Sequence, residues 1–193
     1  MTTANKITIS RILLVPLFVV QVLSYAGSGN EWYRLGALVT FAAAALSDGI
    51  DGYLARRYQQ KSELGAVLDP LADKLLLASG VILLSLDNTP HLPRIPFYVT
   101  AIILSRDMLL FIGSIVIHFI CGKVTVHPIL LGKASTVLQM ALVLWILLKW
   151  PASALPWWAA FAALTTGISG VFYVVEGFRQ LSASPHSAPS PKQ

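Results

Sequence analysis

The chain has 193 residues, of which 55% are hydrophobic and only 12% are charged, and its mean hydropathy is +0.69. This balance excludes an ordinary soluble globular domain and indicates a polytopic membrane protein. The chain has one cysteine, Cys121, which excludes an internal disulfide framework and a zinc site built on paired cysteines.

Six apolar runs, each near the roughly 20 residues that cross a bilayer, predict an all-α fold with six transmembrane helices. In chain order they cover about Ile7–Leu23, Leu35–Leu54, Leu64–Leu86, Ile95–Ile120, Ile129–Leu148 and Leu155–Phe178. The first run starts like a signal peptide but has no convincing small-residue cleavage site, so we expect a retained helix. Short connectors rich in Gly, Pro and Asn leave room for one domain, residues 1–181, and the Ser/Pro-rich residues 182–193 are expected to form a disordered tail.

The lysines and arginines predict the orientation of these helices, because cytoplasmic loops are enriched in both residues. If both termini share one side, that side collects ten of these residues: Lys6, Arg11, Arg56, Arg57, Lys61, Lys74, Lys123, Lys133, Arg179 and Lys192. The opposite side collects Arg34, Arg94 and Lys149. Both termini are therefore expected in the cytoplasm, and the net charge of +5 reflects this asymmetry and anionic lipid rather than nucleic acid.

Five of the nine carboxylates fall between Ser47 and Leu76. Four of them form two pairs at helical spacing, Asp48 with Asp51 and Asp69 with Asp73. Each pair shares one helix face, and the short intervening loop predicts that the two helices are antiparallel neighbours. Four converging carboxylates repel one another unless cations or protons compensate them. Two Mg²⁺ or Mn²⁺ ions, which prefer oxygen ligands, are the simplest compensation.

The residues around these aspartates leave space for a substrate. Small residues stand beside the acids, namely Gly49, Gly52, Ala55, Gly65 and Ala66. Arg56 and Arg57 lie at the mouth of the hairpin, where a guanidinium group can bind phosphate oxygens in a bidentate fork. Metals, arginine and space together favour a diphosphate substrate. The alternatives are that the small residues serve only helix packing or that the acids line an ion or proton pathway.

The segment reads D-x-x-D-G-x-x-A-R-x8-G-x-x-x-D-x-x-x-D and resembles the signature of the CDP-alcohol phosphatidyltransferases at every fixed position. These positions are Asp48, Asp51, Gly52, Ala55, Arg56, Gly65, Asp69 and Asp73. The resemblance implies a six-helix membrane enzyme, commonly a homodimer, with the motif on its second and third helices. A bacterial inner membrane with the active site in the cytoplasm is the expected location.

The resemblance also implies a role for each matching residue. Asp48, Asp51, Asp69 and Asp73 would hold two Mg²⁺ or Mn²⁺ ions, and Asp73 would be the general base. The cytidine and diphosphate of the CDP-linked donor would bind at Gly52, Ala55, Arg56 and Gly65. An acceptor hydroxyl would displace CMP directly, and no serine or cysteine stands beside a histidine in an obvious nucleophile arrangement.

Two further segments resemble the branch of phosphatidylglycerophosphate synthases and CMP-forming cardiolipin synthases. The first is N-x-x-T-x-x-R with Asn5, Thr8 and Arg11, and the second is G-K-x-x-T-x-x-Q with Gly132, Lys133, Thr136 and Gln139. Both imply a glycerol-type acceptor. Arg106 and Lys133 are candidate anchors for an acceptor phosphate, with a structural Arg106–Asp107 pair as the alternative.

Two acceptors fit this branch. Transfer from CDP-diacylglycerol to glycerol 3-phosphate gives phosphatidylglycerophosphate, and transfer to phosphatidylglycerol gives cardiolipin. The stretch SRDMLLFIGSIVIHF resembles cardiolipin synthases, because Ser114 and Ile115 stand where the other group often has a second Arg-Glu pair. Chain length favours glycerol 3-phosphate, which we place first. A transporter, a UbiA-type prenyltransferase and an inactive scaffold are less favoured, because the acids cluster in one intact hairpin motif.

Overall fold

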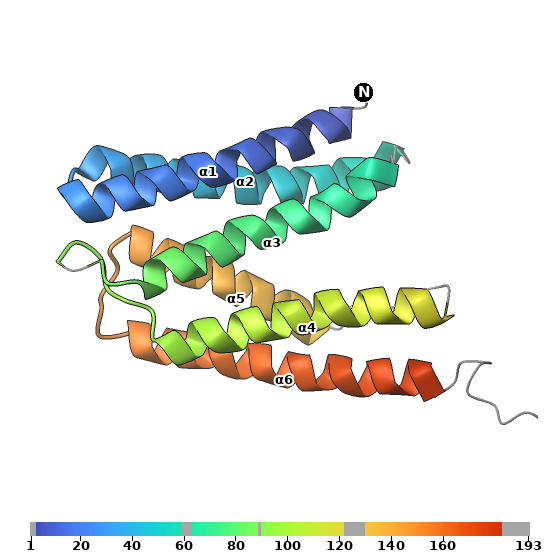
Figure 1. Ribbon diagram of the computed structural model, residues 1–193. Helices are drawn as coiled ribbons and strands as arrows, with labels where there is room; N and C mark the ends of the chain where they lie inside the picture. The colour runs from blue at the N-terminus through green and yellow to red at the C-terminus, as the bar shows by residue number, and fades with distance from the viewer. Residues whose placement is uncertain (1–2, 59–62, 89, 122–129, 183–193) are drawn as a thin grey trace, which may run out of the picture.

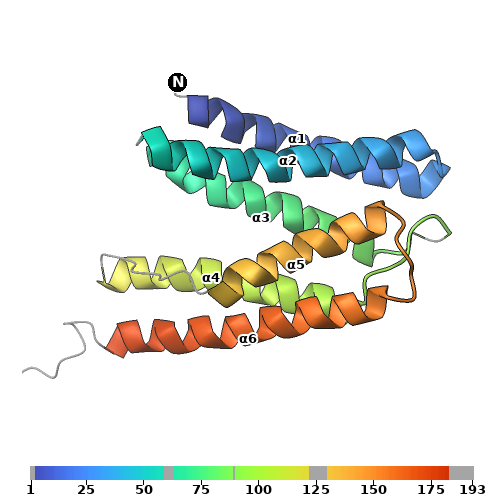
Figure 2. The same ribbon diagram turned by 180° about the vertical axis from the view of Figure 1, so that it is seen from behind.

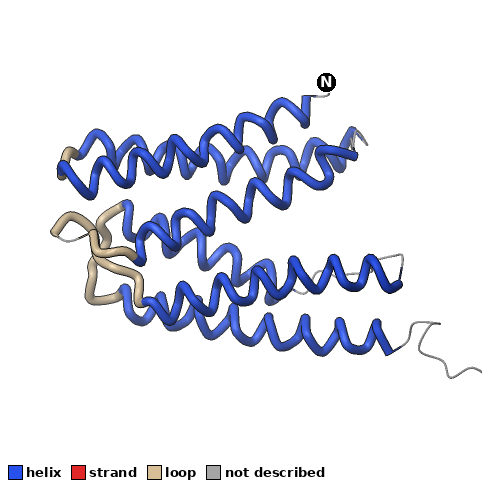
Figure 3. Tube along the Cα trace, in the orientation of Figure 1, coloured by secondary structure: helices blue, strands red, loops and turns tan. Residues whose placement is uncertain are grey.

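The computed structural model describes the backbone of residues 3–58, 63–88, 90–121 and 130–182. For the helical residues 3–9, 48–58, 63–73, 114, 117–121, 178 and 180–182 the description covers the backbone and not the side chains. Within these ranges all regular structure is helical (Figure 3). The helices are α1 (Thr3–Ser28), α2 (Glu31–Tyr58), α3 (Glu63–Ser85), α4 (Phe97–Cys121), α5 (Leu130–Leu147) and α6 (Leu155–Ser182). The all-α prediction is confirmed. Of the predicted tail, residues 182–193, Ser182 ends α6 and the rest lies outside the described residues.

The turn between α1 and α2 shows why the helices run longer than their apolar cores. Gly29 adopts a left-handed conformation with φ of 66°, and its N–H donates to the carbonyl of Tyr25 at 2.8 Å, which ends α1. Asn30 then accepts a hydrogen bond from the backbone N–H of Trp32 at 3.1 Å and caps α2. The second helix therefore begins at Glu31 rather than at the predicted Leu35, because a polar cap does not register as an apolar run.

The six helices form two groups of three. In one group α1 packs against both α2 and α3, and in the other α6 packs against both α4 and α5, while α5 also contacts α3 (Figures 1 and 2). The axes of α3 and α4 lie close together near the segment that joins them and diverge toward the other end of the bundle (Figures 1 and 2). That wider end carries the start of α1, the end of α2 and the start of α3. The predicted aspartate hairpin is thus at the wider end.

The interior is a continuous apolar core, and much of the exterior is apolar as well. Phe18 of α1 and Phe41 of α2 are fully buried, with ring centroids 5.5 Å apart, and Val143 and Ile146 of α5 extend the same core. Large apolar side chains also cover the outside, including Leu13, Val20, Phe161, Leu164 and Val171. A helix that is apolar on all sides is typical of a membrane span.

Three segments of the described chain are long and apolar enough to cross a bilayer: Ser10–Ser28, Leu130–Leu147 and Leu155–Gly177. The protein is therefore an integral membrane protein with a six-helix bundle. That all six helices span the bilayer remains a prediction.

A network of charged groups closes the narrower end of the bundle. Glu31 at the start of α2 accepts hydrogen bonds from Lys149 Nζ at 2.6 Å and from Arg34 Nε at 2.5 Å, and the Tyr25 hydroxyl donates to it at 3.1 Å. These donors lower the pKa of Glu31 from 4.5 to about 2, with Lys149 the largest cause. Arg34 also donates to the carbonyl of Leu147 at the end of α5. The start of α2 is thereby joined to the α5–α6 turn.

Candidate functional site

The four predicted metal ligands lie on two neighbouring helices. Asp48 and Asp51 belong to α2, and Asp69 and Asp73 belong to α3. Each pair lies within one continuous helix, α2 contacts α3, and only residues 59–62 separate the two helices. The backbone thus has the antiparallel hairpin that the sequence predicts. The aspartate side chains lie outside the described residues, as do those of the donor-binding candidates Gly52, Ala55, Arg56 and Gly65.

Next to this hairpin the structure brings together three charged side chains from α3 and α4. Oδ1 of Asp107 accepts from Lys74 Nζ at 2.6 Å and from Arg106 Nη1 at 2.8 Å. The side chain of Arg106 is 5% exposed and that of Asp107 is 14% exposed, whereas Lys74 is 41% exposed. The sequence offered an Arg106–Asp107 pair as an alternative to a phosphate anchor, and this pair is present. Lys74 is an addition that the sequence reasoning missed.

Tyr173 of α6 and Gly132 of α5 complete the surroundings of Arg106. The guanidinium carbon of Arg106 lies 5.5 Å from the centroid of the Tyr173 ring, within the range of a cation–π interaction. A Cβ at Gly132 would lie 2.5 Å from Oη of Tyr173 and 3.2 Å from Nη2 of Arg106. Only glycine therefore allows both side chains to approach α5 so closely. We call Lys74, Arg106, Asp107, Gly132 and Tyr173 the Arg106 cluster.

The electrostatics of the Arg106 cluster favour an anion. Two cationic side chains share one carboxylate, so the cluster has a surplus positive charge. Nε of Arg106 is buried and has no hydrogen-bond partner among the described residues. Lys74 directly follows Asp73 in α3, so the cluster adjoins the predicted catalytic base. A positively charged group beside the predicted metal ligands is suited to binding a phosphate.

The other residues of the G-K-x-x-T-x-x-Q segment have different surroundings. Nε2 of Gln139 donates to Oγ1 of Thr166 at 2.9 Å, and both residues are fully buried, so Gln139 joins α5 to α6. Oγ1 of Thr136 donates to the carbonyl of Gly132 at 3.1 Å within its own helix. Lys133 is exposed. In this segment Gly132 therefore shapes the packing around Arg106 and Gln139 joins α5 to α6, while Lys133 remains available to a ligand.

The N-x-x-T-x-x-R segment lies in the first turns of α1. Arg11 is 1% exposed, which makes it one of the most buried charged residues that the structure describes. The side chains of Asn5 and Thr8 lie outside the described residues. Arg11 follows them within the same continuous helix, one to two turns further on. A buried arginine in a membrane helix is typical of a functional site.

Tyr173 and Lys74 are the contributions that sequence reasoning did not assign to the site. Tyr173 lies in an apolar helix, where an aromatic residue by itself indicates packing. One signal was present: Gly170 and Tyr173 are three residues apart, and a Cβ at Gly170 would lie 3.3 Å from Cγ of Arg106. The small residue and the tyrosine together mark the face of α6 that receives the arginine.

Comparison with known proteins agrees with the hairpin motif. The family model described as CDP-alcohol phosphatidyltransferase matches residues 1–168. The chain belongs to the CDP-alcohol phosphatidyltransferase family. The match covers α1 to α5 and the first half of α6, so both the aspartate hairpin and Arg106 lie within the part that defines this family.

Relatives within the CDP-alcohol phosphatidyltransferase family cover most of this chain. A probable phosphatidylglycerophosphate synthase of Mycobacterium tuberculosis is 36% identical over 190 residues, which is 96% of this chain and 86% of the relative. A CDP-diacylglycerol–glycerol-3-phosphate 3-phosphatidyltransferase of Rickettsia felis is 34% identical over 176 residues, covering 86% of this chain and 91% of the relative. A Pseudomonas fluorescens protein of the same name is 38% identical over 109 residues, or 56% of this chain and 52% of the relative.

Proposed function

We propose that the protein transfers the phosphatidyl group of CDP-diacylglycerol to glycerol 3-phosphate and releases CMP. The observation that carries this proposal is the intact eight-position motif on an antiparallel α2–α3 hairpin, in a chain whose full-length relatives are named for this reaction. The positive Arg106 cluster beside Asp73 supports an acceptor that itself carries a phosphate.

In this proposal the hairpin aspartates bind two divalent cations. Four carboxylates on two adjacent helices match the oxygen ligands and the charge that two Mg²⁺ or Mn²⁺ ions require. When bound, such ions neutralise charge on the diphosphate of the donor. Removal of divalent ions with EDTA should stop CMP release, and added Mg²⁺ or Mn²⁺ should restore it. Turnover that is indifferent to EDTA would contradict this assignment.

The residues of the chain would share the chemical step as follows. Asp73 accepts the proton of the acceptor hydroxyl as its oxygen attacks the phosphorus bonded to diacylglycerol. The bond between that phosphorus and the bridging oxygen to CMP breaks, so CMP leaves with the electron pair. Arg56 binds the diphosphate, and Arg106 with Lys133 orients the acceptor phosphate. No covalent intermediate on the protein is needed.

The alternative acceptor is phosphatidylglycerol, which would give cardiolipin. Ser114 and Ile115 in α4 are the observation that favours it. The experiment is a lipid-product assay in which purified protein, CDP-diacylglycerol and Mg²⁺ receive either glycerol 3-phosphate or phosphatidylglycerol. Phosphatidylglycerophosphate from the first acceptor supports the proposal. Cardiolipin from the second acceptor alone would retain the mechanism and replace the acceptor, while no CMP release from either would contradict the activity.

The remaining parts of the proposal concern assembly and orientation. We infer a homodimer with both termini and the aspartate hairpin in the cytoplasm of a bacterial cell. The distribution of lysine and arginine supports this orientation, and membership of the family supports the dimer. Labelling of single cysteines placed near each terminus, in intact cells and in opened membranes, tests the orientation.

A further inference from the structure

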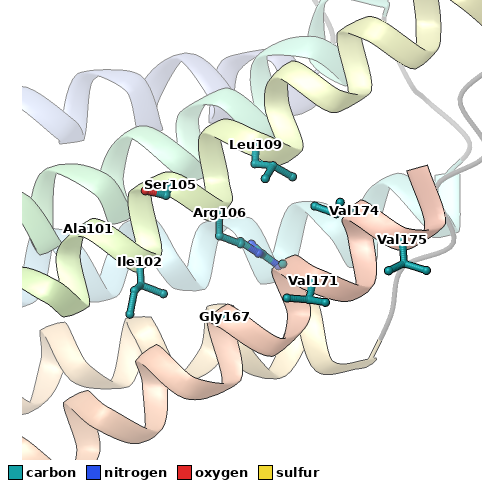
Figure 4. A pocket seen from close by; sticks show the side chains of 10 residues that line it. Ala101, Ile102, Ser105, Arg106, Leu109, Gly167, Val171, Val174 and Val175 are labelled. Atoms are coloured by element: carbon teal, nitrogen blue, oxygen red, sulfur yellow. The ribbon is translucent and has the colours of Figure 1, made fainter. Parts of the chain in front are cut away.

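A groove of about 450 Å³ runs between α4 and α6 (Figure 4). Its walls include Ile102 and Leu109 from α4 and Val171 and Val175 from α6. The groove exists because small residues stand where the two helices face each other, namely Ala101, Gly167 and Gly170. A Cβ at Gly167 would meet nothing within 4 Å, so the space there is open.

The open side of this groove faces the lipid. Val171 and Val175 are 65% and 53% exposed, and both lie in the apolar segment Leu155–Gly177 that can cross a bilayer. Leu109 on the opposite wall is 43% exposed. An apolar groove that opens into a membrane is suited to a hydrocarbon chain, because water in it would lack hydrogen-bond partners.

Two arginines, one in the inner wall of the groove and one beyond its Val175 end, indicate which hydrocarbon chain the groove binds. Its inner wall includes Arg106, whose nearly buried side chain belongs to the cluster beside Asp73. On α6, Arg179 is exposed and follows Val175 by four residues, so it continues the face of α6 formed by Val171 and Val175. The inner wall thus adjoins the cluster beside Asp73, and the exposed Arg179 beyond the Val175 end complements a lipid with an anionic head group.

We propose that the α4–α6 groove binds one acyl chain of the CDP-diacylglycerol donor while its diphosphate lies at the aspartate hairpin. This inference rests on the proposed function and adds to it the place where the lipid part of the donor is held. The groove spans residues 101–109 of α4 and 167–175 of α6, or about 12 Å along each helix. It therefore holds part of a long acyl chain, and the rest extends into the bilayer.

The test fills the groove without disturbing the bundle. Gly167→Leu places a side chain in the open space, and Gly113→Leu is the matched control, because a Cβ at Gly113 also meets nothing within 4 Å and Gly113 does not line the groove. CMP release is measured with dioleoyl and dihexanoyl CDP-diacylglycerol. Gly167→Leu should raise the KM for the dioleoyl donor about tenfold, since each displaced methylene group is worth roughly a fourfold change in affinity. The KM for the dihexanoyl donor should change little, as should both values in the control.

A second measurement does not depend on turnover. CDP-diacylglycerol with a photoreactive diazirine in one acyl chain should label α4 or α6 within residues 101–109 or 167–175 of the wild-type protein, and Gly167→Leu should abolish this label. Labelling confined to other helices, or an equal loss of activity with both donors, would overturn the inference. A change of oligomeric state in Gly167→Leu would overturn it too, because the groove would then belong to an interface between copies. Absence of CMP release from the wild type with either donor would instead contradict the proposed function.

Discussion

Lys74 of α3 and Asp107 of α4 are joined by an ion pair of 2.6 Å, and the same carboxylate oxygen pairs with Arg106. This contact connects the helix that carries Asp69 and Asp73 to the other group of three helices. Lys74 lies near the middle of α3 and Asp107 near the middle of α4, so the contact is between the two ends of the bundle. Asp107 therefore holds Arg106 of α4 next to α3, the helix that carries half of the aspartate hairpin.

Asp107→Asn should destabilise the protein by about 3–5 kcal/mol, because it leaves the buried guanidinium group of Arg106 without its carboxylate. Thermal unfolding in detergent measures the effect. Lys74→Gln is the matched control, since Lys74 is 41% exposed and its loss should cost about 1 kcal/mol or less. If Asp107→Asn destabilised the protein as little as Lys74→Gln does, the buried guanidinium group of Arg106 would not depend on the Asp107 carboxylate.

Gly132→Ala should impair activity and stability, because the new methyl group would occupy the space of the Tyr173 hydroxyl and of Arg106 Nη2. Alanine has a higher helix propensity than glycine by about 1 kcal/mol, so the opposite result is expected where no clash exists. Gly113→Ala provides that comparison. Adding Tyr173→Phe to Gly132→Ala removes the closest contact and should restore part of the loss. If the double variant recovers neither activity nor stability, the clash with the Tyr173 hydroxyl is not the cause of the loss.

Lys133→Ala should raise the KM for the acceptor far more than the KM for the donor, because Lys133 is exposed and next to Gly132. Arg106→Lys keeps the charge but loses the planar fork of the guanidinium group, so it should also act mainly on the acceptor. Steady-state kinetics with each substrate varied in turn separates the two effects. An increase in the donor KM alone would assign Lys133 to the cytidine side of the site.

The helices were predictable from the sequence, but the rotation of each helix about its own axis, which decides the face that meets a neighbour, was not. Long apolar runs identified all six helices, and the spacing of Asp48, Asp51, Asp69 and Asp73 predicted the hairpin on α2 and α3. Helices that are apolar on every side have no polar stripe to show which face meets a neighbour. The partnership of Arg106 with Tyr173 and with Lys74 depends on that rotation, so it required the structure.

Asp73→Asn should lower turnover by about 10²–10⁴-fold, the usual contribution of a general base, while leaving the fold and much of the metal binding intact. CMP release gives the rate, circular dichroism reports the helices, and Mn²⁺ binding reports the site. Near-wild-type turnover would remove Asp73 from the role of base. Loss of Mn²⁺ binding in parallel with turnover would make Asp73 chiefly a metal ligand.

The stability of the narrower end should depend on pH through Glu31. Its pKa is lowered from 4.5 to about 2 by Lys149 and Arg34, so the charged carboxylate stabilises the folded state. This contribution is fully present above about pH 4.5 and is lost as the pH falls toward 2. The difference in melting temperature between the wild type and Glu31→Gln should therefore be larger at pH 7 than at pH 3. A difference that does not vary with pH would exclude the carboxylate charge as its cause.

The contacts at the narrower end also restrict the order in which the folded bundle can form. Arg34 reaches a carbonyl 113 positions later in the chain, and Glu31 pairs with Lys149, 118 positions away. At roughly 5–20 residues per second, ribosomal synthesis needs on the order of 10 s to supply those partners. During that interval α1 and α2, joined by α3 once it is synthesised, lack their contacts with the α5–α6 turn, and Glu31 pairs only with Arg34 and Tyr25. The contacts between the α1–α2 turn and the α5–α6 turn therefore form late in the assembly of this enzyme.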